Sequence, residues 1–276
     1  MILVTGADGQ LGSDVVLELR KRNIDCVGID IDVLDITDSV AVEAYIKALM
    51  PSCVIHCAAY TAVDAAEDEV ELCFLVNEVG TENIARVCCE IDAELIYIST
   101  DYVFDGLGVL PYEVDAPKGA ISTYGKSKLA GELAAQKHLD KLYIVRISWV
   151  FGHVGNNFVK TMLRLAESRD ELNVVADQVG SPTYTPDLAV LLCDMALSGK
   201  YGEYHATNEG FCSWAEFAEE IMMQSGSNCK INPIPTEQYP TKAARPKNSR
   251  LSKTSLDNAG FERLPTWQDA LERFLR

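Results

Sequence analysis

Basic residues are scarce in this chain. The 276 residues include 24 lysines and arginines against 41 aspartates and glutamates, a formal net charge of −17. Nucleic acids and anionic membrane surfaces are bound by clustered Lys and Arg, so we expect neither as a partner. An anionic substrate would need a local basic patch. One candidate lies late in the chain, where Lys242, Arg245, Lys247 and Arg250 fall within nine residues that contain no acid.

Long apolar runs are also missing, as are repeats and C-x-x-C pairs. No run approaches the roughly 18–20 residues of a membrane span, and the first strand begins too early to leave room for a signal peptide. The nine cysteines are irregularly spaced, which is typical of buried, reduced thiols, so we expect a cytoplasmic protein. Cys53, His56 and Cys57 would be the candidate metal ligands. They fall on a predicted strand whose neighbours point to opposite faces, and we predict no metal site there.

What is present is an alternation of short apolar runs with helical patterns. The apolar runs, rich in Val, Ile and Leu, cover residues 2–4, 26–29, 53–56, 95–98 and 142–147. Apolar residues recur every four positions between them, at Leu11, Val15 and Leu19 and again at Val40, Ala44 and Ala48. Strands that alternate with helices predict an α/β fold with a doubly wound parallel sheet, the Rossmann arrangement. A ligand would then bind beyond the carboxyl ends of the strands.

After about residue 150 the alternation loosens. We predict helices at 156–168, 186–197, 213–223 and 267–275, and strands at 173–176, 203–206 and 229–233. Ser213 and Glu216 have the spacing of a capping box. We therefore expect a dinucleotide-binding domain at 1–150 plus about 174–198, and a smaller substrate-binding lobe at 151–173 and 199–276.

A glycine-rich turn follows the first strand. Gly6, Gly9 and Gly12 form G-x-x-G-x-x-G, which lets backbone approach a pyrophosphate at the positive end of a helix. An ordinary tight turn is the alternative. Asp30, 18 residues after Gly12, can accept hydrogen bonds from an adenosine ribose and should disfavour a 2′-phosphate. Asp32 and Asp35 compete for that role.

Two further segments carry candidate chemistry. Ser99 and Thr100 end the fourth strand, where either hydroxyl could hold a substrate carbonyl. Tyr124 and Lys128 are four residues apart, which places them on one face of a helix. A phenol titrates near pH ~10, and a neighbouring cation favours its ionised form. A proton donor beside a dinucleotide site suggests a carbonyl reductase or alcohol dehydrogenase.

With these residues assembled, the chain resembles the extended short-chain dehydrogenase/reductases, and in particular the dTDP-4-dehydrorhamnose reductase family. The matching segments run through almost the whole chain: 59–64 (AYTAVD), 99–106 (STDYVFDG), 124–132 (YGKSKLAGE), 146–150 (RISWV), 155–162 (GNNFVKTM), 177–183 (DQVGSPT) and 245–251 (RPKNSRL). The resemblance implies NAD(P)H-dependent reduction of the C4 ketone of dTDP-4-dehydro-β-L-rhamnose.

The resemblance also implies a role for each matching residue. Tyr124 is the general acid, Lys128 lowers its pKa and binds ribose, and Thr100 supplies the hydroxyl of the catalytic set. NADPH or NADH would be held by Gly6, Gly9, Gln10, Leu11, Gly12, Asp30, Asp35, Ile36, Ala59, Tyr60 and Thr61, together with Tyr124 and Lys128. The dTDP-sugar would contact Thr100, Asp101, Trp149, Arg245 and Arg250. Tyr60 stands where a His is common in the family. Some members dimerise through Mg²⁺, so the resemblance allows Mg²⁺ and either a monomer or a homodimer.

Two other functions are compatible with the same pattern. One is a different sugar-nucleotide reductase or epimerase on this scaffold, against which the segment at residues 245–251 argues. The other is a non-catalytic role, because some relatives of this fold are regulatory subunits, notably of methionine adenosyltransferase. The presence of all three candidate catalytic residues, Thr100, Tyr124 and Lys128, argues against a non-catalytic role.

Overall fold

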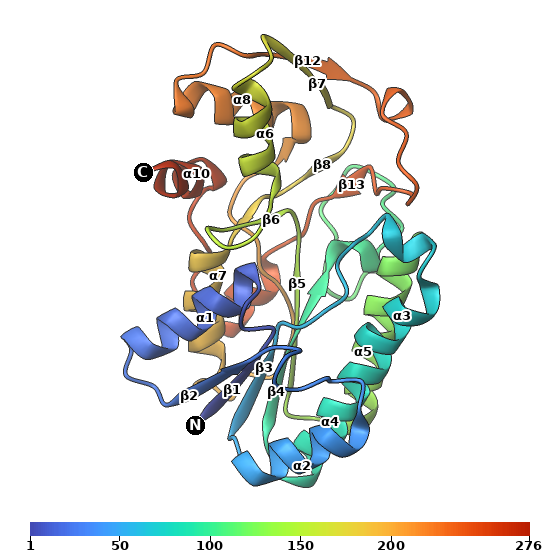
Figure 1. Ribbon diagram of the computed structural model, residues 1–276, viewed down its shortest axis with the longest axis vertical. Helices are drawn as coiled ribbons and strands as arrows, with labels where there is room; N and C mark the ends of the chain where they lie inside the picture. Colours follow the sequence, from blue (N-terminus) through green and yellow to red (C-terminus); the bar gives the residue numbers. More distant parts are fainter.

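A parallel sheet of six strands forms the centre of the molecule, in the order β10-β5-β4-β3-β1-β2 (Figure 1). The computed structural model describes all residues, 1–276. The sheet contains β1 (Ile2–Thr5), β2 (Cys26–Ile29), β3 (Cys53–His56), β4 (Glu94–Thr100), β5 (Leu142–Ile147) and β10 (Gly202–His205). The first five were predicted from their apolar runs, and the doubly wound α/β fold is confirmed. The chain leaves β1 toward β2 and returns to the other side of β1 at β3, so the strand order reverses between β1 and β3.

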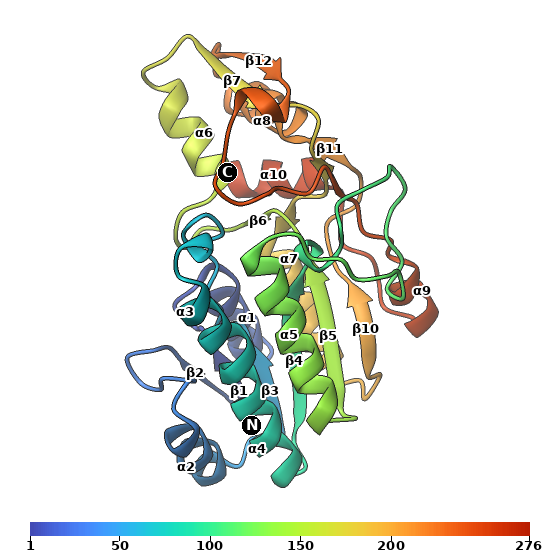
Figure 2. The same cartoon turned by 90° about the vertical axis from the view of Figure 1, so that its right-hand side faces the viewer.

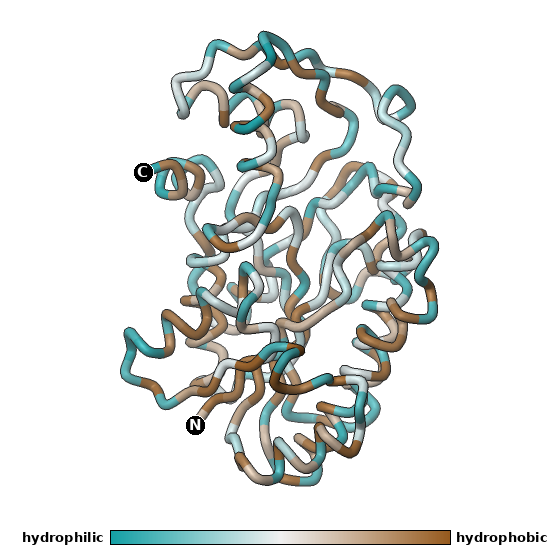
Figure 3. The backbone as a smooth tube through the Cα atoms, in the orientation of Figure 1, coloured by the Kyte–Doolittle hydropathy of each residue, from teal (hydrophilic) through white to brown (hydrophobic).

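Helices cover both faces of this sheet (Figures 1 and 2). One face carries α1 (Gln10–Lys21) and α7 (Thr185–Met195), and the other carries α2 (Ser39–Leu49), α4 (Gly80–Glu90) and α5 (Thr123–His138). Figure 3 shows apolar segments concentrated in the central strands. None of the helices combines the length and the apolarity that a membrane crossing requires.

The predicted inner faces of α1 and α2 have different outcomes. Leu11, Val15 and Leu19 are buried on α1, as expected. On α2 the prediction is wrong: Val40 is 76% exposed, and Ala44 and Ala48 are also exposed, while Val42 and Ile46 are fully buried. Val40, Ala44 and Ala48 form one stripe with four-residue spacing on α2, and Val42 and Ile46 form another. Burial of the stripe with Val42 and Ile46 removes more apolar surface from water, because the other stripe contains two alanines.

A bent helix precedes β4. α3 (Val70–Phe74) continues through a π-helical turn at Leu75–Val79 into α4. Such a turn inserts one residue into the helical ladder and is frequent at functional sites. Here it contains Asn77, which is buried.

The smaller lobe has its own apolar core. It contains α6 (Phe158–Ala166), α8 (Trp214–Ser225), α10 (Trp267–Leu275), and the strand pair β7 (Glu171–Val175) and β12 (Lys230–Ile234). The predicted capping box is confirmed: Ser213 and Glu216 satisfy each other's backbone N–H groups. Short elements connect this lobe to the sheet, namely β6 (Val150–Phe151), β8 (Val179–Gly180), β9 (Thr183–Tyr184), β11 (Cys212–Ser213), β13 (Asn248–Ser249) and α9 (Thr254–Ala259).

Two strands belong to a different part of the molecule from the one predicted for their residues. β10 pairs with β5 in the central sheet, although residues 199–276 were assigned to the lobe. Val174 and Val175 belong to β7, which pairs with β12 in the lobe. In both cases a strand pairs with a partner distant in sequence, and local patterns do not contain that information.

Candidate active site

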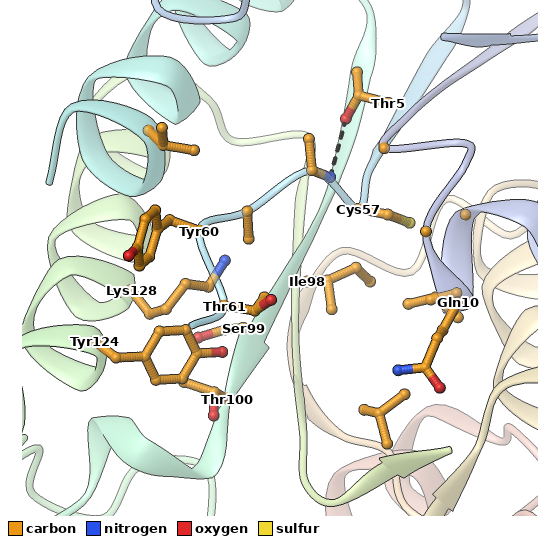
Figure 4. A pocket seen from close by; sticks show the side chains of 18 of the residues that line it. Thr5, Gln10, Cys57, Tyr60, Thr61, Ile98, Ser99, Thr100, Tyr124 and Lys128 are labelled. Carbon is orange, nitrogen blue, oxygen red and sulfur yellow. Dashed lines mark hydrogen bonds between the residues drawn. The ribbon is translucent and has the colours of Figure 1, made fainter. Parts of the chain in front are cut away.

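A cavity of about 730 Å³ opens beyond the carboxyl ends of the strands (Figure 4). Four loops that follow β1, β2, β3 and β4 contribute to its wall, within residues 6–12, 30–35, 58–64 and 99–105. Every residue predicted to bind the cofactor lines this cavity, and so do Thr100, Asp101 and Trp149. Arg245 and Arg250 do not.

The glycine turn packs too tightly for side chains. Gly6 has φ +66°, and a Cβ there would lie 2.6 Å from the backbone nitrogen of Ala58. A Cβ on Gly12 would lie 2.1 Å from the carbonyl oxygen of Gly6. Helix α1 begins at Gln10 directly after this turn, so its free N–H groups lie at the cavity wall. These features fit the diphosphate of a dinucleotide.

The acidic residues after β2 differ in position. The Asp30 carboxylate accepts hydrogen bonds from the backbone N–H groups of Asp8 at 3.0 Å and Ile31 at 2.8 Å, and it lines the cavity. Asp35 also lines the cavity, whereas Asp32 does not. Asp30 and Asp35, and not Asp32, therefore remain the candidates for contact with an adenosine group.

Helix α5 presents Tyr124 and Lys128 to the end of β4 (Figure 4). The Ser122 hydroxyl caps this helix by accepting from the Gly125 N–H at 3.1 Å. The Glu67 carboxylate accepts from the N–H of Thr123 at 2.8 Å and from its hydroxyl at 2.9 Å. The first turn of α5 is thus held from two directions, which fixes the position of Tyr124.

The two candidate hydroxyls at the end of β4 have separate partners. Thr100 lies next to the phenol of Tyr124, and its Oγ1 donates to Asp101 Oδ1 at 3.0 Å. Because that donation uses the only Thr100 hydroxyl proton, the phenol would be the donor in any hydrogen bond between the two groups. Ser99 instead donates to Glu132 Oε1 at 2.5 Å. Of the two hydroxyls, the one next to the candidate acid is that of Thr100.

Burial controls the protonation of the central pair. Burial raises the pKa of Tyr124, and the neighbouring Thr100 hydroxyl only partly offsets this rise. The expectation that Lys128 would lower this pKa is therefore wrong for the net shift. Burial also lowers the pKa of Lys128 to about 7, against an opposing effect of Glu132. A phenol with a raised pKa is fully protonated near neutral pH, which is the form that a proton donor needs.

Two residues for which no role was predicted from sequence contribute to the site: Trp214 lines the cavity, and Asn77 is buried behind the loop after β3. The Asn77 side chain accepts from the Tyr60 N–H at 2.8 Å, and it donates to the Tyr60 carbonyl at 3.1 Å and the Ser127 hydroxyl at 2.9 Å. It therefore ties the loop after β3 to α5.

Trp214 and Trp149 form a stacked pair at the cavity wall. Their ring centroids are 3.6 Å apart with an interplanar angle of 14°, and both residues line the cavity. Trp149 has φ +50°, an uncommon backbone conformation for a bulky residue. Its ring lies against Gly180, where a Cβ would come within 2.9 Å. One Trp comes from the sheet and one from the lobe, so the pair connects the two parts.

The late basic segment is paired with acids from elsewhere in the chain. Arg245 donates to Asp64 Oδ2 at 2.6 Å and to the Tyr102 hydroxyl at 3.1 Å. Arg250 donates to Asn248 Oδ1 at 3.0 Å. Lys242 pairs with Asp68, and Lys247 with Asp177 and Glu237. The segment itself contains no acidic residue, but acidic residues from elsewhere in the chain lie beside it in the fold. Asp64 and Asp68 approach it from the loop after β3. Tyr102, a partner of Arg245, lines the cavity.

The structure contains no cluster of three or more His, Cys, Asp or Glu side chains that could hold a metal ion. His56 is buried, with Nδ1 2.7 Å from the Thr5 hydroxyl and Nε2 3.2 Å from that of Thr81. In Figure 4, Thr5 also accepts the dashed hydrogen bond from the Ala58 N–H.

The fold and the arrangement of Thr100, Tyr124 and Lys128 define a dinucleotide-binding protein with the architecture of the extended short-chain dehydrogenase/reductases. More narrowly, the chain belongs to the RmlD substrate binding domain family, whose model matches residues 1–276.

Individual relatives match over nearly the full length. The spore coat polysaccharide biosynthesis protein SpsK of Bacillus subtilis is 41% identical over 100% of this chain and 96% of its own. The dTDP-4-dehydrorhamnose reductase of Aggregatibacter actinomycetemcomitans is 40% identical over 98% of this chain and 97% of its own. A crystal structure of the dTDP-4-dehydrorhamnose reductase of Bacillus anthracis in complex with NADP superposes with a TM-score of 0.97 at 43% identity, covering 99% of this chain and 97% of that one.

Proposed function

We propose that this protein is a dTDP-4-dehydrorhamnose reductase, which uses NADPH or NADH to reduce the C4 ketone of dTDP-4-dehydro-β-L-rhamnose to dTDP-L-rhamnose. The observation that carries the proposal is that Thr100, Tyr124 and Lys128 line the same cavity as the glycine turn. Relatives named for this activity match over nearly the whole chain.

The cavity suits a dinucleotide along its length. Gly6, Gly9, Gln10, Leu11 and Gly12 would hold the diphosphate at the start of α1. Asp30, Asp35 and Ile36 would hold the adenosine end, and Ala59, Tyr60 and Thr61 the middle of the cofactor. When bound, the reduced nicotinamide supplies the hydride that adds to C4.

Tyr124 would give its phenol proton to the substrate O4 as charge develops there. Thr100 sits beside that phenol and holds the carbonyl oxygen in line. The ammonium group of Lys128 compensates the phenolate that remains and binds the nicotinamide ribose. Positioned acid catalysis of this type typically contributes about 10²–10⁴-fold to the rate.

We assign the sugar nucleotide to the side of the cavity near the lobe. Asp101 and Trp149 line that side, and Trp214 stacks on Trp149. Arg245 and Arg250 would bind the substrate diphosphate. For Arg245 this requires the phosphate to compete with Asp64 for the same guanidinium, which charge-assisted bonds of similar strength permit.

We further propose that the enzyme works in the cytoplasm as a monomer or a homodimer. All nine cysteines are free, and most of them are buried, which suits a reducing compartment.

The direct test is oxidation of NADPH and of NADH by the purified protein with dTDP-4-keto-6-deoxy-L-lyxo-hexose, followed by absorbance and by identification of the product. A panel of dTDP, UDP and GDP keto sugars separates this reductase from a related enzyme. Rapid turnover of a different keto sugar alone would overturn the substrate assignment. No turnover together with a stoichiometric protein partner would favour a regulatory subunit.

A further inference from the structure

Asn157 connects the smaller lobe to the wall of the cavity. It is the N-cap residue of α6, whereas Gln10 is the first residue of α1 and lines the cavity. The Nδ2 of Asn157 donates to Gln10 Oε1 at 3.0 Å, across 147 positions of the sequence. Gly155 lies in the same loop, and a Cβ there would be 3.5 Å from Gln10 Cγ. The loop before α6 therefore contacts a side chain at the start of α1.

The other partners of Asn157 fix the orientation of its amide. Its Oδ1 accepts from the backbone N–H of Lys160 at 3.0 Å, which caps α6. Its Nδ2 also donates to the carbonyl oxygen of Gly152 at 2.8 Å. A backbone N–H can only donate and a carbonyl oxygen can only accept. The nitrogen of the Asn157 amide, and not its oxygen, therefore faces Gln10.

The orientation of the Gln10 amide follows from that of Asn157. Because Asn157 presents a donor, Gln10 accepts with Oε1, and the two protons of its Nε2 remain for another partner. In Figure 4 the amide nitrogen of Gln10 points toward the interior of the cavity. The hydrogen bonds that begin at Lys160 thus end in a donor beside the first turn of α1.

A donor at this position suits an anionic group. A hydrogen bond from an amide N–H to a phosphate oxygen is charge-assisted and stronger than a bond between neutral groups. The opposite orientation of the Gln10 amide would place a carbonyl oxygen against the phosphate, and two acceptors cannot form a hydrogen bond. Fixing the amide before the ligand arrives also avoids the cost of ordering a flexible side chain during binding.

We propose that Asn157 is a positioning residue for the cofactor: it orients the Gln10 amide so that Nε2 donates to the diphosphate of the bound dinucleotide. The inference rests on the proposed function, which assigns the diphosphate of NADPH or NADH to the start of α1. It makes the smaller lobe part of cofactor binding, because the residue that caps α6 also sets the hydrogen-bonding polarity beside the glycine turn.

A double-mutant cycle in NADPH binding tests this role. Asn157→Ser keeps a preferred N-cap residue for α6 and removes the amide that donates to Gln10. Ordering a side chain during binding lowers affinity by about 3–10-fold, so we expect the Kd for NADPH, measured by fluorescence titration, to rise by that factor. In a Gln10→Ala background the same substitution should change the Kd by less than about twofold. An equal rise in both backgrounds, or no rise in either, would overturn the proposal.

Thr161→Val is the matched control. The Thr161 hydroxyl donates to the backbone carbonyl of Asn157 at 2.9 Å, so its removal disturbs the same turn of α6 without changing the donor to Gln10. We expect this variant to bind NADPH with the affinity of the wild type. A rise in Kd as large as that of Asn157→Ser would show that a loosened α6, and not the orientation of Gln10, weakens binding, and the proposal would fail.

Hydrogen exchange covers the case in which Asn157→Ser does not fold. Coupling between two parts of a protein is reciprocal, so NADPH bound to Gln10 should slow exchange of the Lys160 amide, whose N–H is held by Asn157. We expect this slowing in the wild type and its loss in Gln10→Ala at saturating NADPH. Slowing of the same size in Gln10→Ala, or none in the wild type, would contradict the proposal.

Both measurements use NADPH alone, which separates this inference from the proposed function. A wild type that binds NADPH and reduces no keto sugar would fail as a reductase, while the dependence of the Asn157→Ser effect on Gln10 would still support the positioning role. An active reductase in which Asn157→Ser and Gln10→Ala act independently would keep the proposed function and overturn only the role of Asn157.

Discussion

The hydroxyl of Thr100 donates a hydrogen bond to Asp101 Oδ1 at 3.0 Å, and both residues line the cavity together with Tyr124. Because this bond uses the only proton of the Thr100 hydroxyl, its oxygen can act toward Tyr124 only as an acceptor. The Tyr124 phenol lies next to Thr100 at the end of β4. A substrate carbonyl that enters beside Thr100 meets the phenol there.

Thr100→Val tests this alignment. The substitution keeps the shape of the side chain and removes the hydroxyl that lies next to the phenol of Tyr124. Misplacement of a reacting group by about 1 Å costs on the order of 10²-fold, and we expect a loss of that size in kcat. Thr100→Ser restores the hydroxyl and should recover most of the rate. A valine variant with wild-type kcat would contradict the alignment.

Gly12→Ala should damage cofactor binding before any chemistry. The added Cβ would lie 2.1 Å from the Gly6 carbonyl oxygen, whereas a Cβ on Gly9 would lie 3.2 Å from the same atom. The backbone must shift in the first case and only adjust in the second. We expect Gly12→Ala to lower both the melting temperature and NADPH affinity far more than Gly9→Ala, as measured by calorimetry and fluorescence titration. Equal effects would argue against the tight turn as the cause.

Asp30 should decide between the two nicotinamide cofactors. Its carboxylate lines the cavity, while Asp32 does not. Two like charges about 4 Å apart repel by about 1–4 kcal/mol near a protein surface, and 1.4 kcal/mol corresponds to about tenfold. We expect Asp30→Asn to raise the ratio of kcat/KM for NADPH over NADH by about tenfold. Asp32→Asn should leave the ratio unchanged, and a similar change in both variants would contradict the assignment.

Arg245→Met should weaken substrate binding without slowing the chemical step. A hydrogen bond to a charged group contributes about 1.5–3 kcal/mol, so we expect KM for the dTDP-sugar to rise about 10–100-fold with kcat nearly constant. Lys247→Met is the control, because Lys247 pairs with Asp177 and Glu237 and we assign it no contact with the substrate. If KM stays at the wild-type value for Arg245→Met, the ion pair with Asp64 is structural only.

Asp101 should make stability depend on pH. Burial raises its pKa from 3.8 to about 6, and the neighbouring Ser249 and Thr100 hydroxyls oppose this rise only in part. A carboxyl with a raised folded pKa costs no stability below its unfolded value and the full amount above its folded value. Asp101→Asn should therefore gain up to about 3 kcal/mol over wild type, growing from pH about 4 to about 6. Chemical denaturation across this range measures the gain, and a constant difference between the two proteins would contradict it.

The parts of the fold that follow from local pattern could be predicted. β2, β3 and β5 begin and end where their apolar runs do, because strands buried on both faces need continuous Val, Ile and Leu. The capping box at Ser213 and Glu216 is a three-residue pattern and is present as expected. The cofactor side of the cavity follows from the same logic, since it consists of loops that directly follow predicted strands.

The features that were missed depend on residues distant in sequence. Arg245 reaches Asp64 across 181 positions, so a segment that looks basic in sequence is paired in the fold. Trp214 meets Trp149 only after the lobe packs against the sheet. The pKa of Tyr124 depends on how deeply α5 is buried, which the spacing of Tyr124 and Lys128 does not reveal.

The central claim is that Tyr124 donates the proton. Its most direct test is single-turnover reduction by Tyr124→Phe, with NADPH affinity measured on the same sample. We predict a loss of about 10²–10⁴-fold in the rate of ketone reduction with NADPH affinity within a few-fold of wild type. Ketone reduction at a rate close to that of the wild type would contradict the account.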